Sequence, residues 1–279
     1  MWLLDIDSLE LHRYRQAVDD PPYVALSHCW GDGGITLNDL RSLRAARDVK
    51  IESHRAGRRL TQSIPSLPSP VAKRTTSHFL DTGTLGTHTR SRLPQLNEVN
   101  HSAAERGTRV LEACAEARTF GVQKLWVDDL CIDRSSSAEI SEAINSMFRI
   151  FQNARVCLAH LSDLNTQQGP FDTPERRIEQ SRWGSRVWVL QEIIAAKDMQ
   201  FYDNQWTRLG TKKSLLPFLS SFLRIDRAVL ENSECLPDFS TGRRMSWAAR
   251  LSANRSEDVA YSLLGIFGLN LPISGFIPS

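Results

Sequence analysis

The chain has 279 residues, a net charge of +2 at pH 7, 41% hydrophobic residues and 24% charged residues. These values are typical of a globular protein with a substantial core, and they exclude collagen-like and wholly disordered chains. The sequence lacks the run of about 18 apolar residues that a membrane-spanning helix needs. Acidic residues interrupt the N-terminal segment too early for a signal peptide. We therefore expect no membrane span and a cytoplasmic location.

The cysteines and histidines give no sign of a metal or disulfide framework. Five cysteines are present, and no two of them form a Cys-x-x-Cys pair. Most lie in apolar runs, where a thiol behaves as a small hydrophobic group. His28 and His160 end apolar runs and have no second ligand at a metal spacing. These residues thus predict no disulfide framework, no metal site built on cysteine or histidine, and a reducing compartment.

The first predicted strand covers residues 23–28 and leads into a glycine loop at residues 31–34. The stretch from about residue 45 to 105 is different, because it is poor in aromatic residues and rich in Ser, Thr, Pro and Arg. The charge between Arg41 and Arg106 is +7, whereas the rest of the chain carries −5. Low hydrophobicity with excess charge predicts a disordered insertion. A basic run could bind nucleic acid, but no aromatic stacking platform accompanies it, so we favour a solvated loop and expect no specific nucleic acid partner.

Helices and strands alternate after the insertion. Ser136 and Glu139 form a capping box, and apolar residues recur on one stripe of the helix that follows. Parallel strands joined by right-handed crossovers give this alternation, so we predict a doubly wound, mostly parallel α/β sheet. The segment after residue 215 has a helical pattern. We expect an α/β domain over residues 1–210 and a helical C-terminal extension over residues 211–279. The elements expected between the first strand and the extension are helix 109–120, strand 124–128, the capped helix, strand 155–161, helix 185–196 and strand 199–202.

Four blocks of the sequence resemble the fungal heterokaryon incompatibility (HET) domain in order and spacing. They are residues 23–31 (YVALSHCWG), 125–148 (LWVDDLCID through SEAINSMF), 181–192 (SRWGSRVWVLQE) and 244–268 (RMSWAA through EDVAYSLLGIFG). The resemblance covers nearly everything except about residues 45–105. It implies an effector of programmed cell death in vegetative incompatibility, the non-self recognition of fungi. It also implies activation by self-association or by a partner incompatibility protein of the nucleotide-binding, oligomerising (NLR) type.

Two features depart from the HET pattern. The basic insertion lies where similar proteins have a short link, and residues 271–275 stop where relatives continue into further helix. Both would arise if intron sequence had been translated into the chain, and the C-terminal extension would then be truncated. Sequencing the transcript tests this hypothesis, and a message that retains codons 50–105 would end it.

Candidate ligand-binding residues follow the first two predicted strands, since ligands of open α/β sheets bind beyond the carboxyl ends of strands. Ser27, Trp30 and Gly31 follow the first strand, and the glycine loop could present backbone N–H groups to a phosphate. The alternative is a plain turn, because the lysine of a P-loop is missing. Asp128, Asp129 and Asp133 follow the second strand and could hold a ribose or a magnesium ion. The alternative is that these carboxylates cap the next helix or pair with an arginine.

Trp188 and Glu192 are four residues apart, which places them on one face of the predicted helix. Their Trp-x-Leu-x-Glu run resembles the helix of Toll/interleukin-1 receptor (TIR) domains, so the fold implied is TIR-like and flavodoxin-like. That resemblance implies that Glu192 is the catalytic carboxylate of an NAD glycohydrolase, with NAD as its substrate and Arg186 and Trp188 in the ligand site. The alternative is a non-catalytic signalling module in which Glu192 pairs with Arg186 or Lys197. Trp183 alternates with apolar residues and is expected in the core.

Overall fold

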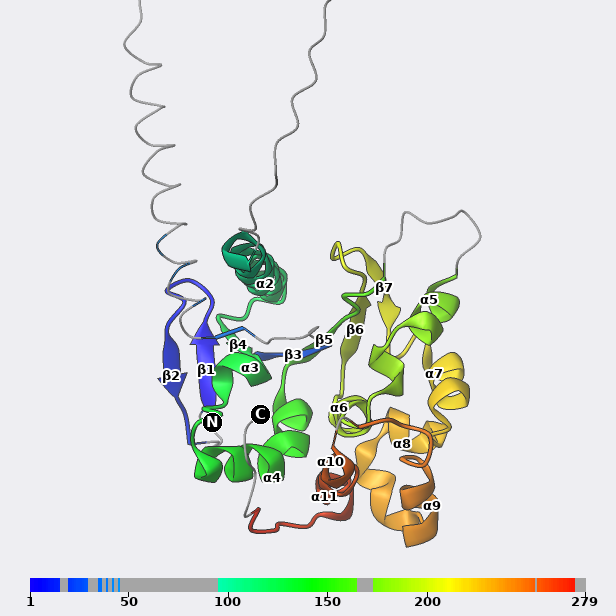
Figure 1. The fold of residues 1–279 in the computed structure, drawn as a ribbon. Helices are drawn as coiled ribbons and strands as arrows, with labels where there is room; N and C mark the ends of the chain where they lie inside the picture. The colour runs from blue at the N-terminus through cyan, green and yellow to red at the C-terminus, as the bar shows by residue number, and fades with distance from the viewer. Residues whose placement is uncertain are drawn as a thin grey trace, which may run out of the picture.

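One mixed sheet of seven strands organises the computed structural model (Figure 1). The structure describes residues 1–15, 20–29, 35–36, 39, 42, 45, 95–164, 173–253 and 255–273, with the backbone alone for residues 95–106. The strand order is β2-β1-β4-β3-β5-β6-β7. The strands are β1 (Trp2–Asp5), β2 (Leu11–Arg13), β3 (Val24–His28), β4 (Lys124–Trp126), β5 (Val156–His160), β6 (Met199–Tyr202) and β7 (Arg208–Thr211).

The four central strands are parallel. β3 pairs with β4 on one side and with β5 on the other, and β5 pairs with β6. The outer strands β1, β2 and β7 are antiparallel to their neighbours. The prediction of an α/β fold with a parallel centre is confirmed. The sheet is more mixed than predicted, because the N-terminal hairpin of β1 and β2 and the edge strand β7 were not expected.

Helices cover both faces of the sheet (Figure 1). α2 (Gln95–Thr119) lies on one face, and α4 (Ser137–Asn153) and α6 (Val189–Ala195) pack together on the other. The chain moves one way from β3 to β4 and the opposite way from β4 to β5, so right-handed crossovers place their helices on opposite faces. The remaining helices are α3 (Asp128–Cys131), α5 (Pro174–Gln180), α7 (Leu216–Leu223), α8 (Arg227–Glu231), α9 (Thr241–Ser246), α10 (Ser256–Tyr261), α11 (Leu264–Phe267) and the 3-10 turns η1 (Trp183–Ser185) and η2 (Ser233–Asp238).

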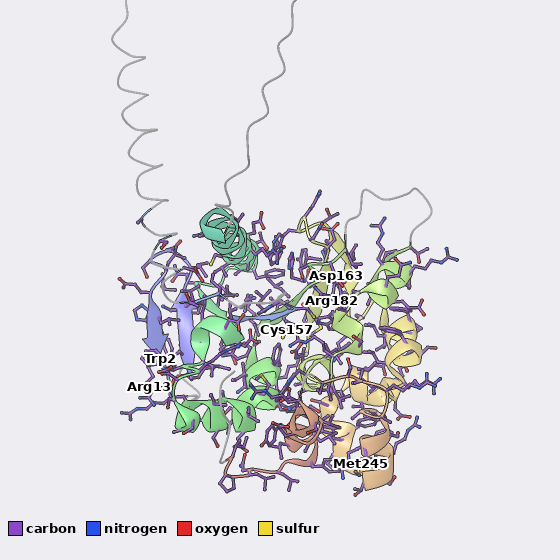
Figure 2. The ribbon with its side chains drawn as sticks, viewed as in Figure 1. Trp2, Arg13, Cys157, Asp163, Arg182 and Met245 are labelled. Carbon is purple, nitrogen blue, oxygen red and sulfur yellow. The ribbon has the colours of Figure 1, made fainter. Side chains whose placement is uncertain are left out.

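The predicted cap of α4 is present in part. Ser136 is the N-cap residue, and its Oγ accepts a hydrogen bond from the Glu139 backbone N–H at 3.3 Å. The Glu139 carboxylate accepts from the indole Nε1 of Trp2, at 3.3 and 3.4 Å. The cap therefore begins the helix, and its carboxylate also joins α4 to the N-terminal hairpin. Trp2 and Arg13 lie together at this edge of the molecule (Figure 2).

The predicted disordered insertion, residues 45–105, is wrong for its last part. Residues 95–105 belong to α2, which begins at Gln95 and not near residue 109. This stretch contains no proline and includes good helix formers such as Ala103, Ala104 and Glu105. It can therefore extend the helix whose buried face includes Val110 and Ala117. Apart from residue 45, the rest of the predicted insertion lies outside the described residues.

The predicted helix 185–196 is broken at Arg186. The turn η1 ends there, with φ −79° and ψ 137° at Arg186, and α6 begins at Val189. The extended backbone is held by Ser252, whose N–H donates to the Ser185 carbonyl at 2.6 Å and whose carbonyl accepts from the Val187 N–H at 2.9 Å. A contact with a distant segment thus overrides the local helical pattern and sets the backbone position from which the Arg186 side chain extends.

The C-terminal segment after β7 is helical, as predicted, and packs beneath the sheet. α8 contacts α6, and α11 contacts α4. The buried side chains of Leu219, Val229 and Trp247 belong to the same continuous core as the sheet. The division into residues 1–210 and 211–279 stays a prediction. No helix in the described part of the chain is long and apolar enough to cross a membrane.

Candidate functional site

A topological switch point lies between β3 and β5. The chain leaves β3 toward β4 on one side, and β5 pairs with β3 on the other. In open α/β sheets the crevice at such a point, beyond the carboxyl ends of the strands, is where ligands bind. Ser27 and His28 end β3, in register with Ala159 and His160 of β5. The fold therefore places the predicted Ser27 at the position where a ligand is expected.

Ser27 connects Glu192 to Trp183. The Ser27 Oγ donates a hydrogen bond to the Glu192 carboxylate and accepts one from the Trp183 indole Nε1 at 2.7 Å. Ser27 and Trp183 are fully buried, and Glu192 is 7% exposed. Burial raises the pKa of Glu192 above its usual range, although the charge of Arg186 and the hydrogen bond from Ser27 oppose that rise. The prediction placed Trp183 in the core, which is confirmed, but missed its role as a hydrogen-bond donor at the site.

Arg186 lies between the end of β3 and Glu192. Its guanidinium donates to the backbone carbonyl of His28 and lies 3.5 Å from the Sγ of Cys29. Its charge lowers the pKa of both Glu192 and Asp128. Arg186 and Lys197 were the two partners predicted for Glu192 in a non-catalytic module. The charge of Arg186 acts on the Glu192 carboxylate, whereas Lys197 is exposed.

His28 and two carboxylates form a second polar group. The Nε2 of His28 lies 2.7 Å from the Oδ1 of Asp128, and Arg134 donates to Asp129. Burial would raise the pKa of Asp128, but the charge and hydrogen bond of His28, helped by Arg134 and Arg186, hold it below its usual range. Burial and the neighbouring Asp128 charge raise the pKa of Asp129 to about 6.

One ligand atom from each of His28, Asp128 and Asp129 lies within 4.8 Å of the others. The sequence pattern predicts a structural role for His28, because no second ligand stands near it along the chain. Residues 28 and 128 are brought together by the parallel pairing of β3 with β4, after which α3 begins. The available signal was therefore topological, because both residues follow adjacent parallel strands.

Two predicted site residues have other partners. Asp133 is exposed, and its Oδ1 accepts from the Ser135 backbone N–H at 2.9 Å and from the Ser135 Oγ at 2.6 Å. It therefore stabilises the turn before α4. Trp188 is half-buried and packs against Ile140, Ile144 and Leu264, and its side chain also donates to Asp258.

The remaining two predicted site residues, Trp30 and Gly31, lie outside the described residues. The segment after β5 and the segment before η1 are joined to each other by Asp163 and Arg182. The Asp163 Oδ2 accepts from the Arg182 backbone N–H at 2.7 Å and forms an ion pair with the Arg182 Nε at 3.5 Å. Figure 2 shows these two residues together above Cys157 of β5. This contact joins the segment after β5 to the segment that carries Trp183.

Comparison with known proteins finds one matching family model and one similar curated protein. A family model described as "Heterokaryon incompatibility protein (HET)" matches residues 74–177. The chain is also 37% identical, over 171 residues, to the vegetative incompatibility protein HET-E-1 of Podospora anserina. Both comparisons thus relate part of the chain to the HET family. The HET family match takes in β4, α3, α4 and β5, and with them Asp128 and Asp129.

The matched region is a small part of the relative. It covers 60% of this chain and 12% of HET-E-1, so the activity and partners of the whole relative are not carried over to this chain. No solved structure matches the chain.

Proposed function

We propose that this HET domain is a cytoplasmic effector of programmed cell death in fungal non-self recognition. The observation that carries this function is the match to the HET family and to a protein named for vegetative incompatibility. We propose that self-association switches the domain on, directly or through a partner incompatibility protein of the NLR type. The order of the four parallel strands supports a flavodoxin-like and TIR-like kinship, since taken in chain order they lie second, first, third and fourth across the sheet.

Expression in a fungal host tests the effector function. The chain would be placed under an inducible promoter, and colony growth and dye exclusion would be followed after induction. Growth arrest with loss of membrane integrity is the expected result. Unimpaired growth at a protein level confirmed by immunoblot, both for the chain alone and for a forced dimer, would contradict the proposal.

A second candidate function is hydrolysis of NAD at Glu192. The specific observation in its favour is the position of Glu192, which is buried at the switch point with Ser27 and Arg186 around it. Cleavage of the nicotinamide–ribose bond passes through an oxocarbenium-like state, which a nearby carboxylate stabilises. Nicotinamide leaves as a neutral molecule, so no strong general acid is required, and water then completes the reaction. A ribose hydroxyl would replace the Ser27 hydroxyl as the donor to Glu192.

Nicotinamide release from NAD tests this candidate. Purified protein at high concentration would be incubated with NAD, and Glu192→Gln would be compared with Glu231→Gln, a change at an exposed carboxylate on α8. Only Glu192→Gln should abolish release. Because the ionised carboxylate is required and burial raises its pKa, the rate should rise with pH through a range above that of an ordinary glutamate. Equal release from both variants would exclude Glu192 as the catalyst, and killing without release would favour the signalling module.

A further inference from the structure

His28, Asp128 and Asp129 converge from two neighbouring elements at the end of the sheet. His28 ends β3, and the two aspartates begin α3 directly after β4. We propose that these three side chains bind a divalent first-row transition metal ion, with Mn²⁺ and Zn²⁺ as its representatives. The site is separate from the Ser27–Glu192 contact and does not depend on NAD cleavage.

The spacing of the donor atoms suits a shared ion. Two ligands at about 2.1 Å from a metal lie about 3 Å apart when they are adjacent in an octahedron. The His28 Nε2 and the Asp128 Oδ1 are 2.7 Å apart, so a small outward movement makes room for an ion between them. The candidate ligand atom of Asp129 lies no more than 4.8 Å from both, a limit that includes the separations of about 3 Å between adjacent ligands and about 4.2 Å between opposite ligands. The three donors can therefore close on one ion through side-chain movement alone.

Asp129 supplies the observation that favours a ligand over a simple ion pair. Its side chain is 4% exposed, and its Oδ2 is buried and makes no hydrogen bond of good geometry within the described residues. Its partner Arg134 binds Oδ1 and is 58% exposed, so solvent weakens that attraction. The backbone N–H of Ile35 interacts with this carboxylate, but a buried oxygen that lacks a hydrogen bond of good geometry is costly. A metal ion would satisfy it and would also offset the repulsion between Asp128 and Asp129.

The mixture of donors indicates which ions fit. Carboxylates alone suit Mg²⁺ and Ca²⁺, whereas an imidazole nitrogen favours transition metals. The His28 ring would have to be neutral and present Nε2 to the metal, which then replaces the hydrogen bond between His28 and Asp128. Water molecules would complete the coordination shell, since three protein ligands leave positions open.

Titration of the purified full chain with MnCl₂, followed by electron paramagnetic resonance of free Mn²⁺, tests the site. The wild-type chain should bind one Mn²⁺. Asp129→Asn should weaken binding at least about tenfold, whereas Asp238→Asn, a change at an exposed aspartate of η2, should alter it less than twofold. Equal affinities of the two variants, or no saturable binding, would overturn the proposal and leave the cluster as an ion-pair network.

A spectroscopic measurement on the wild-type protein keeps the test valid if Asp129→Asn does not fold. Pulsed electron paramagnetic resonance of bound Mn²⁺ should show coupling to one imidazole nitrogen, and His28→Gln should remove that coupling. Bound Mn²⁺ without nitrogen coupling would refute the assignment to His28. Neither measurement uses NAD, so failure of the metal site and failure of the Glu192 chemistry can be told apart.

Discussion

The replacement of Ser27 by alanine should destabilise the protein far more than the loss of one hydroxyl group suggests. Ser27 is fully buried between Trp183 and Glu192. Its hydroxyl donates to the Glu192 carboxylate and accepts from the Trp183 indole N–H. Removal of the hydroxyl leaves the fully buried indole N–H without its acceptor, at a cost of about 1–3 kcal/mol, and deprives a carboxylate of a donor worth about as much. The space left by one hydroxyl is too small for a water molecule to replace it. We expect a total loss of about 2–4 kcal/mol in the free energy of unfolding.

Urea denaturation followed by tryptophan fluorescence measures this loss. Ser262→Ala is the matched control, because Ser262 is also fully buried but donates only to a carbonyl three residues earlier in its own segment. The control should lose about 1 kcal/mol or less. Since 1 kcal/mol corresponds to roughly 2–4 °C for a chain of this size, Ser27→Ala should also lower Tm by about 5–15 °C. A loss no larger than that of Ser262→Ala would refute the view that Ser27 satisfies two buried groups.

Two further predictions concern packing and pH. Gly265→Ala should destabilise the protein by about 1–3 kcal/mol, because a Cβ there would lie 2.2 Å from the Cβ of Phe148 on α4. A Cβ at Gly242 would meet no atom within 4 Å, so Gly242→Ala should stabilise α9 by up to about 1 kcal/mol. Urea midpoints of Gly265→Ala and Gly242→Ala that move in the same direction would contradict the packing argument. Burial lowers the pKa of Lys212 to about 8, below the value of about 10.4 in an unfolded chain. The unfolded state therefore binds more protons between these values, and stability should rise with pH from about 8 to 10. In urea midpoints measured against pH, Lys212→Met should flatten that rise, whereas Lys213→Met, a change at an exposed lysine, should not. An unchanged pH profile in Lys212→Met would refute the assignment of the rise to Lys212.

Local sequence signals were sufficient for the centre of the sheet. Apolar runs predicted β3 and β5, and the Ser136 cap predicted where α4 begins, because these features depend on neighbouring residues. The hairpin of β1 and β2 was missed although Asp5 gives a usable sign. Its Oδ1 accepts from the backbone N–H groups of Asp7 and Ser8, an arrangement typical of aspartate at a turn.

The candidate site could be predicted only in part, for a physical reason. The position of Ser27 and Asp128 at the strand ends follows from strand order, and Glu192 was found from its spacing to Trp188. The break at Arg186 could not be foreseen, since it depends on hydrogen bonds to Ser252 far along the chain. Contacts between side chains that are distant in sequence are set by tertiary packing, which periodicity does not report.

The polar groups at the end of β3 divide into two because side chains alternate along a strand. Ser27 and His28 are consecutive, so they point to opposite faces of the sheet. Ser27 accordingly meets Trp183 and Glu192, and His28 meets Asp128. Arg186 connects the two groups, since it binds the His28 carbonyl and its charge lowers the pKa of both Glu192 and Asp128.

This division has a consequence for function. Burying charged groups costs several kcal/mol per ion, and apolar side chains of similar volume would often serve stability as well or better. A role at the switch point of the sheet explains these polar groups better than stability does. Because the two groups lie on opposite sides of one strand, loss of a metal ion at His28 should leave the Ser27–Glu192 contact in place. Arg186, whose charge reaches both, is the residue through which one group would alter the other.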